Sequence, residues 1–416
     1  MSEGDIRGAA ERLEELIAPF DQLFGKEEAR RHARTYLKGL MSELSRKSIE
    51  PIAKAMGGGR LSALQKFVNA APWRASALLK EIQRAFGFWL KEHNEGPVVL
   101  TISEYGFAKK GRESVGVARQ WNATTRRNEN SQVGIYLIAT TGEVSCLLDS
   151  RLYLPATWCD GSDIVRRRRL RTHVPAGSHH QTKTQIAFDF LRRCRSMGFV
   201  EADWVVTEEN LCNDGELIDS FEPSRQHFLI GIPPTEQVFV REPFRPQGER
   251  SGYISPNRDE IATTVSDLCE VLPSDIWRST LLQLPGKIIH ERYAMIRVRS
   301  TLTSMSSRPL CLVIRGGSDE DCESLEYYLS DTGPETSPDE IATALHRANS
   351  ASKFFQEAEQ YLGLGHYETR SWDGWHHHMS LVALAHWFAS SVGSKLHAES
   401  RKDSSFGIAP SGRDQF

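Results

Sequence analysis

The sequence lacks paired cysteines. Its seven cysteines are scattered along the chain and include no Cys-x-x-Cys pair. An odd number at such spacing argues against a disulfide framework or a zinc ribbon, and it is typical of reduced thiols in a cytoplasm. We therefore expect a cytoplasmic protein.

Long apolar runs and a strong net charge are also missing. No stretch approaches about 18 unbroken apolar residues, and the N-terminus, MSEGDIRGAAERLEEL, is acidic and amphipathic with no apolar signal core. We expect no membrane association. The formal net charge of -3 does not indicate nucleic-acid binding for the molecule as a whole, although local clusters can still form a basic face.

The remaining composition is that of a folded protein, with 39% hydrophobic and 25% charged residues. A chain of 416 residues is too long for one ordinary core, which predicts two or three domains or one large domain with an insertion. Apolar residues at helical spacing, such as Leu13, Leu16, Ile17 and Phe20, predict an all-helical N-terminal domain over residues 1–95.

Strand patterns begin after this helical region. Apolar runs bounded by turn residues predict strands at 98–102, 114–120, 132–140, 144–149, 204–207, 310–314 and 325–329. Helical patterns follow at about 183–197, 338–361 and 375–391. Together they predict an α/β domain over residues 96–394, with an inserted or irregular segment around 233–300. The polar tail, 395–416, is expected to be disordered.

Acidic residues follow two of the predicted strands. Glu104 comes near the end of the first, in TISEYGF, and Glu208 with Glu209 comes directly after WVVT. A third acid, Glu368, is expected on a late helix. Carboxylates from two strands and a helix can hold two divalent cations over a phosphodiester, because each supplies hard oxygen ligands.

Several sequence blocks occur in one order between about residues 30 and 390. They are YLKGLMSELSRKSIEPIAKAMGGG, GFAKKGRESVGVARQW, QVGIYL with LLDSRLYLP, the TK pair at 182–183, and HYETRSWDGWHHHMSLVALAH. In this order the blocks resemble the bacterial insertion-sequence transposases of the DDE superfamily. The resemblance implies an RNase H-like catalytic core, a helical N-terminal domain, double-stranded DNA as the partner and Mg²⁺ or Mn²⁺ as the cofactor of an active member. A homodimer is compatible with it.

The resemblance also implies an Asp-Asp-Glu catalytic triad, whose positions here hold Ser103, Glu208 and Glu368. With Ser103 in place of an aspartate, one carboxylate is missing. With Glu208 in place of an aspartate, the carboxylate lies about 1.5 Å, one bond length, further from the backbone. Glu104 is a neighbour but not a simple substitute, because successive strand residues point to opposite faces. The family's R-W-x-I-E element is also absent, since residues 347–352 read RANSAS. We therefore predict a degenerate site, with Glu208 and Glu368 as its remaining metal ligands.

Basic residues accompany this site and predict contacts with the backbone of duplex DNA. They are Lys109, Lys110, Arg112, Arg119, Arg166, Arg167, Arg168, Arg169 and Arg171. The alternative interpretation is that these are solvated charges on exposed loops. Trp372 and Trp375 could stack on an unpaired base or belong to the core. For His376 to His378 a structural role is favoured, because consecutive helical residues point in different directions.

Three functions remain open from the sequence. The first is a domesticated, transposase-derived DNA-binding protein with lost or strongly weakened strand cleavage. The second is an active metal-dependent nuclease or transposase in which Glu104 or a shifted loop replaces the missing Asp. The third is a repurposed enzyme that acts on a small molecule in the old cleft, using Glu104, Glu208, Glu368 and Lys109 for acid–base chemistry.

Overall fold

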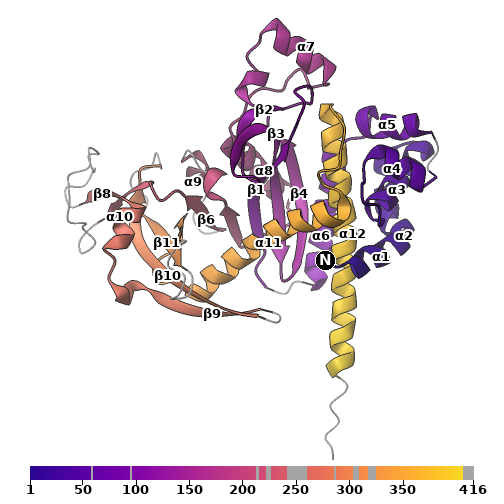
Figure 1. Ribbon diagram of the computed structural model, residues 1–416. Helices are drawn as coiled ribbons and strands as arrows, with labels where there is room; N and C mark the ends of the chain where they lie inside the picture. The colour runs from indigo at the N-terminus through magenta and orange to yellow at the C-terminus, as the bar shows by residue number, and fades with distance from the viewer. Residues whose placement is uncertain are drawn as a thin grey trace, which may run out of the picture. The chain divides into compact units, whose positions relative to one another are not determined.

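The computed structural model describes residues 1–57, 60–93, 96–211, 215–221, 226–240, 260–284, 287–302, 309–316 and 325–405. The chain divides into two compact units (Figure 1). Unit 1 consists of Met1–Ile82, Val144–Cys146 and Phe354–Phe416, and unit 2 consists of Gln83–Glu143 and Leu147–Lys353. Within the described ranges, no helix has the length and apolar character needed to cross a membrane.

Unit 1 is built from helices. They are α1 (Glu3–Glu11), α2 (Leu13–Ile17), η1 (Ala18–Phe24), α3 (Glu27–Leu40), α4 (Ile49–Ala55), α5 (Leu61–Ala70), the start of α6 (Ala75–His93), the end of α11 (Pro338–Leu362) and α12 (Trp372–Ser405). A capping box starts α1, in which the Ser2 hydroxyl accepts from the Asp5 amide and the Asp5 carboxylate accepts from the Ser2 amide.

The core of unit 1 includes the first half of α12. His377 stacks on Trp73 with ring centroids 3.8 Å apart, and its ring nitrogens lie 2.8 Å from two backbone carbonyl oxygens. His378 bonds to the Tyr36 hydroxyl at 2.9 Å. The Trp375 side chain is fully buried. The histidine run therefore has the structural role favoured from sequence, and Trp375 is a core residue that cannot stack on a base.

The domain boundaries predicted at residues 95 and 395 differ from the limits of the compact units and of the last helix. Helices α1 to α6 do lie before residue 95, but the compact unit that holds most of them also includes the C-terminal helix. A separate N-terminal domain therefore stays a prediction. Helix α12 continues to Ser405, so residues 395–405 are helical and not disordered, while 406–416 lie outside the described residues.

Unit 2 is organised around one mixed sheet. Its strands are β1 (Val99–Ala108), β2 (Ala118–Asn122), β3 (Arg127–Thr141), β4 (Val144–Leu152), β5 (Trp204–Thr207), β6 (His227–Ile232), β7 (Gln237–Val240), β8 (Ile261–Thr264), β9 (Arg278–Leu284), β10 (Lys287–Ser300), β11 (Leu310–Gly316) and β12 (Glu326–Ser330). The order is β2-β3-β1-β5-β6-β12-β11-β10-β7-β8, with β4 beside β3 and β9 beside β10. Every predicted strand is present, but the one expected at 98–102 continues to Ala108, so Ser103 and Glu104 lie within it, and the one expected at 114–120 starts later, at Ala118.

The centre of this sheet is parallel. Strand β1 pairs antiparallel with β3 but parallel with β5, and β5 pairs parallel with β6. Helix α8 (Lys183–Met197), predicted at the same residues, supplies part of the long connection that a parallel β5 requires. This mixed α/β arrangement is consistent with the RNase H-like core expected from the resemblance.

The segment at 233–300 is more regular than its composition predicts. It contains β7, β8, α10 (Val265–Glu270), β9 and β10, while residues 241–259 lie outside the described part. Strands β10, β11 and β12 continue the same sheet to β6. Strand β9 pairs with the first part of β10 and forms a two-stranded ribbon at this side of the sheet (Figure 1).

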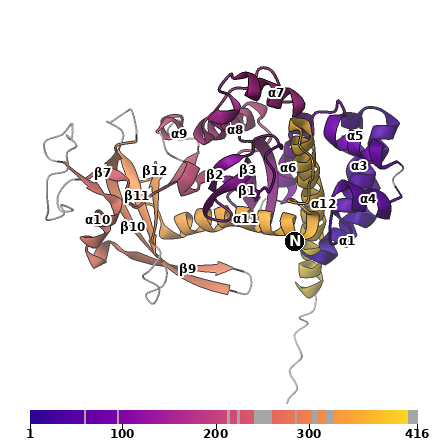
Figure 2. The same ribbon diagram turned by 45° about the horizontal axis from the view of Figure 1, so that its top comes forward.

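Helix α11 covers one face of the central strands (Figure 2). Ile341, Leu345 and Ala348 on α11 form a buried cluster with residues of β1, β5 and β11, such as Val99 and Val206. The three helical residues share one face because they recur at three-to-four spacing. This packing fixes which residues of α11 face the ends of β1 and β5.

The part of α6 in unit 2 approaches the chain after α8 very closely. A Cβ atom added to Gly87 would lie 2.1 Å from the carbonyl oxygen of Phe199. Backbone cannot yield as a flexible side chain can, so only glycine fits at this contact. The same helix is tied to β4 by a hydrogen bond of 2.9 Å from the Gln83 amide to the Leu148 carbonyl.

We expect Gly87→Ala to lower the free energy of unfolding by about 1–3 kcal/mol, the usual cost of overpacking. At an exposed helical site, replacing glycine by alanine would raise the free energy of unfolding by up to about 1 kcal/mol. The sign of the change therefore distinguishes a close contact from an exposed site. Urea unfolding measures the difference. Gly177→Ala is the control, because no atom lies within 4 Å of its added Cβ. A stabilised Gly87→Ala protein would contradict the close contact.

Candidate functional site

The register of β1 and β5 brings two predicted site residues together. The last residues that the two strands pair are Ile102 and Thr207, so the next residues are Ser103, within β1, and Glu208, directly after β5. The Ser103 side chain is buried, with 1% of its surface exposed, and its hydroxyl has no hydrogen-bond partner of standard geometry. A hydroxyl therefore lies beside a carboxylate at the carboxyl end of the parallel pair.

Glu208 sits in an environment that disfavours its charge. Burial raises the pKa of its carboxyl to about 7, and the negative charge of Glu104 adds to the rise. The nearby Ser103 hydroxyl and the Lys183 ammonium oppose the rise without cancelling it. Glu208 is thus a carboxyl that changes charge near neutral pH, which is unusual for a glutamate.

Glu104 is already occupied by a cation. Its carboxylate, whose side chain is fully buried, forms an ion pair with the ammonium of Lys183. Lys183 is the first residue of α8, and the helix is fixed there by a capping box between Thr182 and Gln185. Breaking the pair would leave a buried charge uncompensated, which is strongly destabilising. Glu104 is therefore held by Lys183 and is not a free ligand.

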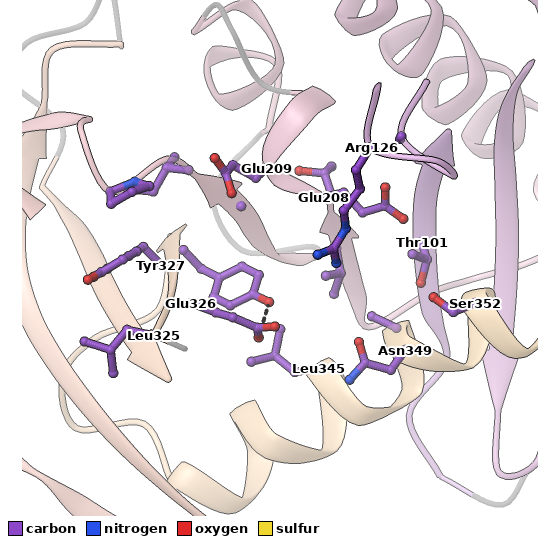
Figure 3. Close-up of a pocket in the computed structure, with 18 of the residues that line it drawn as sticks. Thr101, Arg126, Glu208, Glu209, Leu325, Glu326, Tyr327, Leu345, Asn349 and Ser352 are labelled. Atoms are coloured by element: carbon purple, nitrogen blue, oxygen red, sulfur yellow. Dashed lines mark hydrogen bonds between the residues drawn. The ribbon is translucent and has the colours of Figure 1, made fainter. Parts of the chain in front are cut away.

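A cavity of about 570 Å³ opens beside Glu208, entirely within unit 2. Its walls include Thr101 of β1, Arg126 of the β2–β3 turn, Tyr327 of β12 and Asn349 of α11. Figure 3 shows the Arg126 side chain reaching into this space near Glu208, with Asn349 on the α11 side. The cavity thus combines acidic, basic, amide and aromatic groups.

A close backbone contact positions the acidic turn after β5. A Cβ atom on Gly231 of β6 would lie 2.7 Å from the Glu209 amide nitrogen and 2.9 Å from the Thr207 carbonyl oxygen. The turn continues into η3 (Glu209–Leu211), whose Leu211 carbonyl accepts a hydrogen bond of 3.0 Å from Thr184 of α8. The backbone that carries Glu208 is therefore held from both β6 and α8.

Glu368 differs from its expected setting. It lies in the segment between α11 and α12, ahead of the first residue of α12, and not on a helix. Its side chain is 54% exposed and forms an ion pair with Arg46. Both residues belong to unit 1, whereas Ser103 and Glu208 belong to unit 2. The convergence of Glu368 with the other two positions stays a prediction.

The arginine run lies on a helix, α7 (Asp163–Arg171), and not on a loop. Val165 is its buried residue, and Arg168 and Arg169 share that face because they follow at three and four positions. Arg168 lies 3.9 Å over the Trp158 ring, and Arg169 donates to the Ser178 carbonyl at 2.6 Å. These two arginines hold the helix in place.

The remaining arginines of α7 face solvent. Arg166, Arg167 and Arg171 are exposed, and the last lies 3.7 Å from Glu113. Through the hydrogen bonds that Arg168 donates to the carbonyls of Arg112 and Val117, α7 is joined to the segment after β1. The exposed basic side chains on or beside that segment are Lys110, Arg112 and Arg119, while Lys109 is half-buried, 5.8 Å from the Phe107 ring. The predicted basic residues thus gather on linked elements of unit 2.

Comparison with known proteins gives the family. Residues 19–284 match the family model described as DDE superfamily endonuclease, and the chain belongs to this family. A "Probable transposase for insertion sequence element IS701" from Microchaete diplosiphon is 28% identical over 161 residues. That match covers 39% of this chain and 38% of the relative, so the chain spans well under half of the relative's length. Glu368 lies beyond the range that matches the family model.

Endonucleases of this superfamily usually use divalent metal ions. Among the residues that the structure describes, no group of three His, Cys, Asp or Glu side chains could hold a metal. At the Ser103–Glu208 pair one donor is a neutral hydroxyl, and the neighbouring Glu104 is bound by Lys183. A two-metal site needs several hard anionic ligands. Of the two predicted triad positions in unit 2, Glu208 supplies a carboxylate and Ser103 does not.

Two residues of this site were missed as functional candidates by sequence reasoning. The sequence analysis names Lys183 only as part of the TK block. Its ion pair with Glu104 depends on how α8 packs against β1. Arg126 lies in the polar stretch NATTRRNEN, which indicates a turn but not which side chain enters a cavity. Its positive φ of 54° has no sequence signal, because the turn residue is neither glycine nor asparagine.

We expect Glu208→Gln to stabilise the protein at alkaline pH. The raised pKa means that the folded state binds more protons than the unfolded state between about pH 4.5 and 7. The stability that the native carboxyl contributes is therefore complete below about pH 4.5 and is lost as the pH rises through about 7. At pH 8 the variant should gain about 1–3 kcal/mol, allowing for partial exposure.

Urea unfolding at pH 5 and pH 8 measures this pH-dependent difference. The control is Glu209→Gln, which removes an exposed neighbouring carboxyl and should leave the pH dependence of the native protein unchanged. An equal gain from Glu208→Gln at both pH values would show that the burial of Glu208 does not shift its ionisation.

Proposed function

We propose that this protein is a transposase-derived DNA-binding protein in which metal-dependent strand cleavage is lost or strongly weakened, and that it has been repurposed. The observation that carries the proposal is that Ser103, within β1, and Glu208, directly after β5, follow the last paired residues of these two parallel strands. In the family pattern, two aspartates stand at these positions. Here one carboxylate is replaced by a hydroxyl, and the other belongs to a glutamate.

Charge explains why cleavage should weaken. Two divalent cations stabilise the attacking and leaving oxygens of a phosphodiester only if anionic ligands hold them in place. A neutral hydroxyl is a weak ligand, and the raised pKa of Glu208 means that part of this carboxyl is uncharged at pH 7. A ligand displacement of about 1 Å can itself cost about a hundredfold in rate. All three effects act in one direction.

The nuclease alternative requires a substitute for the first acid. Glu104 is the nearest acidic residue in sequence, but its carboxylate would have to leave Lys183 and turn to the opposite face of β1. This change would leave the Lys183 ammonium without its counter-charge, although the Lys183 side chain is only 21% exposed. The pair therefore favours the non-cleaving function over the rearranged one.

DNA binding is supported by the basic residues of unit 2. The solvent-facing arginines of α7 and the basic segment after β1 belong to elements that Arg168 joins directly. Arginine and lysine side chains on one such surface neutralise phosphates and release counterions, a favourable term that does not depend on DNA sequence. The overall charge of -3 does not oppose this, because the effect is local.

We expect no Mg²⁺- or Mn²⁺-dependent nicking of supercoiled DNA by the native protein. The double variant Ser103→Asp with Glu208→Asp should bind Mn²⁺ more tightly in calorimetry, because it places two short carboxylates at these neighbouring positions. Glu368→Ala is tested alongside. Metal-dependent nicking by the native protein that disappears in Glu368→Ala would refute the non-cleaving function and establish the nuclease alternative.

We expect native protein to shift duplex DNA at low salt, with an affinity that falls steeply as salt increases. Replacing both Arg167 and Arg171 by Ala should weaken binding and reduce the slope of log affinity against log salt by about 2, near one unit for each lost phosphate contact. Thermal unfolding should change little, because both side chains are exposed.

The matched control for this surface is Arg192→Ala, which removes an exposed arginine from α8. It should leave both the affinity and the salt slope at native values. Absence of any gel shift at low salt, or an equal effect of the α8 control, would show that α7 is not a DNA-binding surface.

A further inference from the structure

Strand β9 is an edge strand without the usual protection of an edge. Among the described strands it pairs with β10 alone. Every second residue of β9 therefore directs its backbone N–H and C=O groups away from β10, where no described strand pairs with them. From Ser279 to Gln283 the strand has no charged residue and no proline, which are the residues that commonly keep an edge from pairing with another chain. The edge is open to a further strand.

One face of the β9–β10 ribbon is held by the chain around the start of α11. The Thr280 hydroxyl donates to the Asp339 carboxylate, and the Arg278 guanidinium donates to the Pro334 carbonyl. Thr280 is buried, as is Glu291, which pairs with it across the ribbon. Both views show the ribbon running out from the sheet (Figures 1 and 2). These contacts fix the base of the ribbon before a partner binds, which lowers the entropic cost of binding.

The opposite face of the ribbon is exposed and carries apolar side chains. Leu281 and Ile288 have 58% and 60% of their surfaces exposed. They are diagonal neighbours on this face, because Leu281 pairs with His290 and Gln283 pairs with Ile288. Exposed apolar neighbours beside an unpaired edge indicate a surface that binds another chain.

The charges of this edge favour a second copy of the chain as the partner. A nucleic acid or an anionic surface requires cations, and residues 279–283 supply none. The guanidinium of Arg292, on the same ribbon, lies over the Trp277 ring, 4.7 Å from its centroid. A charged strand of another protein would find no opposite charges along 279–283. A second β9 is equally neutral, so antiparallel pairing of two copies places no like charges opposite each other.

We propose that two copies of this chain associate through β9, paired antiparallel about a twofold axis at Leu281. In this register Leu281 faces its own counterpart, and Ser279 faces the counterpart of Gln283, as a symmetric interface requires. The two Ile288 side chains flank the two leucines, so the exposed apolar residues form one patch on a four-stranded sheet. This self-association surface goes beyond the proposed function and does not depend on DNA binding.

The size of this interface predicts how strong the dimer is. A pair of seven-residue strands buries less surface than the about 1,200 Å² at which stable interfaces begin. We therefore expect a reversible dimer whose population grows with protein concentration. Sedimentation velocity of the full chain at increasing concentrations measures this population.

We expect Leu281→Lys to weaken the dimer about tenfold or more, because two ammonium groups would face each other across the new strand pair. The matched control is Leu170→Lys, which makes the same change at a leucine of α7 that is 77% exposed. The control should leave the dimer at native strength. Thermal unfolding should change little in either variant, because both leucines are exposed.

Disulfide formation tests the register independently. Oxidation of the Leu281→Cys protein should link two chains, because opposite residues of an antiparallel pair have Cα atoms about 4.5–5.5 Å apart, within reach of a disulfide. Ser279→Cys is the matched control. Its two substituted positions would lie four residues apart along the strands, about 13 Å, which is too far to link. The native protein gives the background from its own cysteines.

Loss of the dimer in Leu281→Lys, together with selective cross-linking of Leu281→Cys, establishes the β9 interface. A native protein that stays monomeric at every concentration refutes it. A dimer that Leu281→Lys leaves unchanged, or that Leu170→Lys weakens equally, also refutes it, as does equal cross-linking of Ser279→Cys and Leu281→Cys. None of these results bears on the proposed function, which is tested by nicking and gel-shift assays.

Discussion

The parallel pairing of β1 with β5 is the constraint on which the candidate site depends. It aligns Ile102 with Thr207 and so makes Ser103, within β1, and Glu208, directly after β5, neighbours. Residues from the β2–β3 turn, β6, β12 and α11 then enclose the space beside Glu208. The chemistry of the site follows from what these two positions carry, a hydroxyl and a carboxyl of raised pKa.

The ion pair between Glu104 and Lys183 is the second determinant of the site. It joins β1 to the start of α8 and places a counter-charge beside a carboxylate that is completely buried. The adjacent residues Ser103 and Glu104 therefore have separate functions, one facing Glu208 and the other anchoring a helix. A strand separates neighbouring side chains in this way by its two-residue period.

Much of this architecture could be predicted from the sequence, because it depends on local patterns. The continuous apolar run at 204–207 and the helix at 183–197 appear at their predicted residues, since length, apolar content and a capping Thr182 determine them. The neighbouring positions of Ser103 and Glu208 followed from the resemblance. The strands within 233–300 were not predicted, because Pro and Arg interrupt the pattern that sheet pairing later completes. The setting of Glu368 ahead of α12, the Glu104–Lys183 pair and the entry of Arg126 into the cavity depend on tertiary packing, which periodicity does not encode.

The helix α7 shows that identical neighbouring residues can belong to different layers of a protein. Arg168 and Arg169 are turned inward onto Trp158 and backbone carbonyls, whereas Arg167 and Arg171 are turned outward. Replacing all the arginines of the run at once would unfold the helix and also remove its surface charge. An assay could not distinguish the two effects. In this segment, the arginines to be replaced together are those on one face of the helix. Their adjacency in the sequence does not show which face they share.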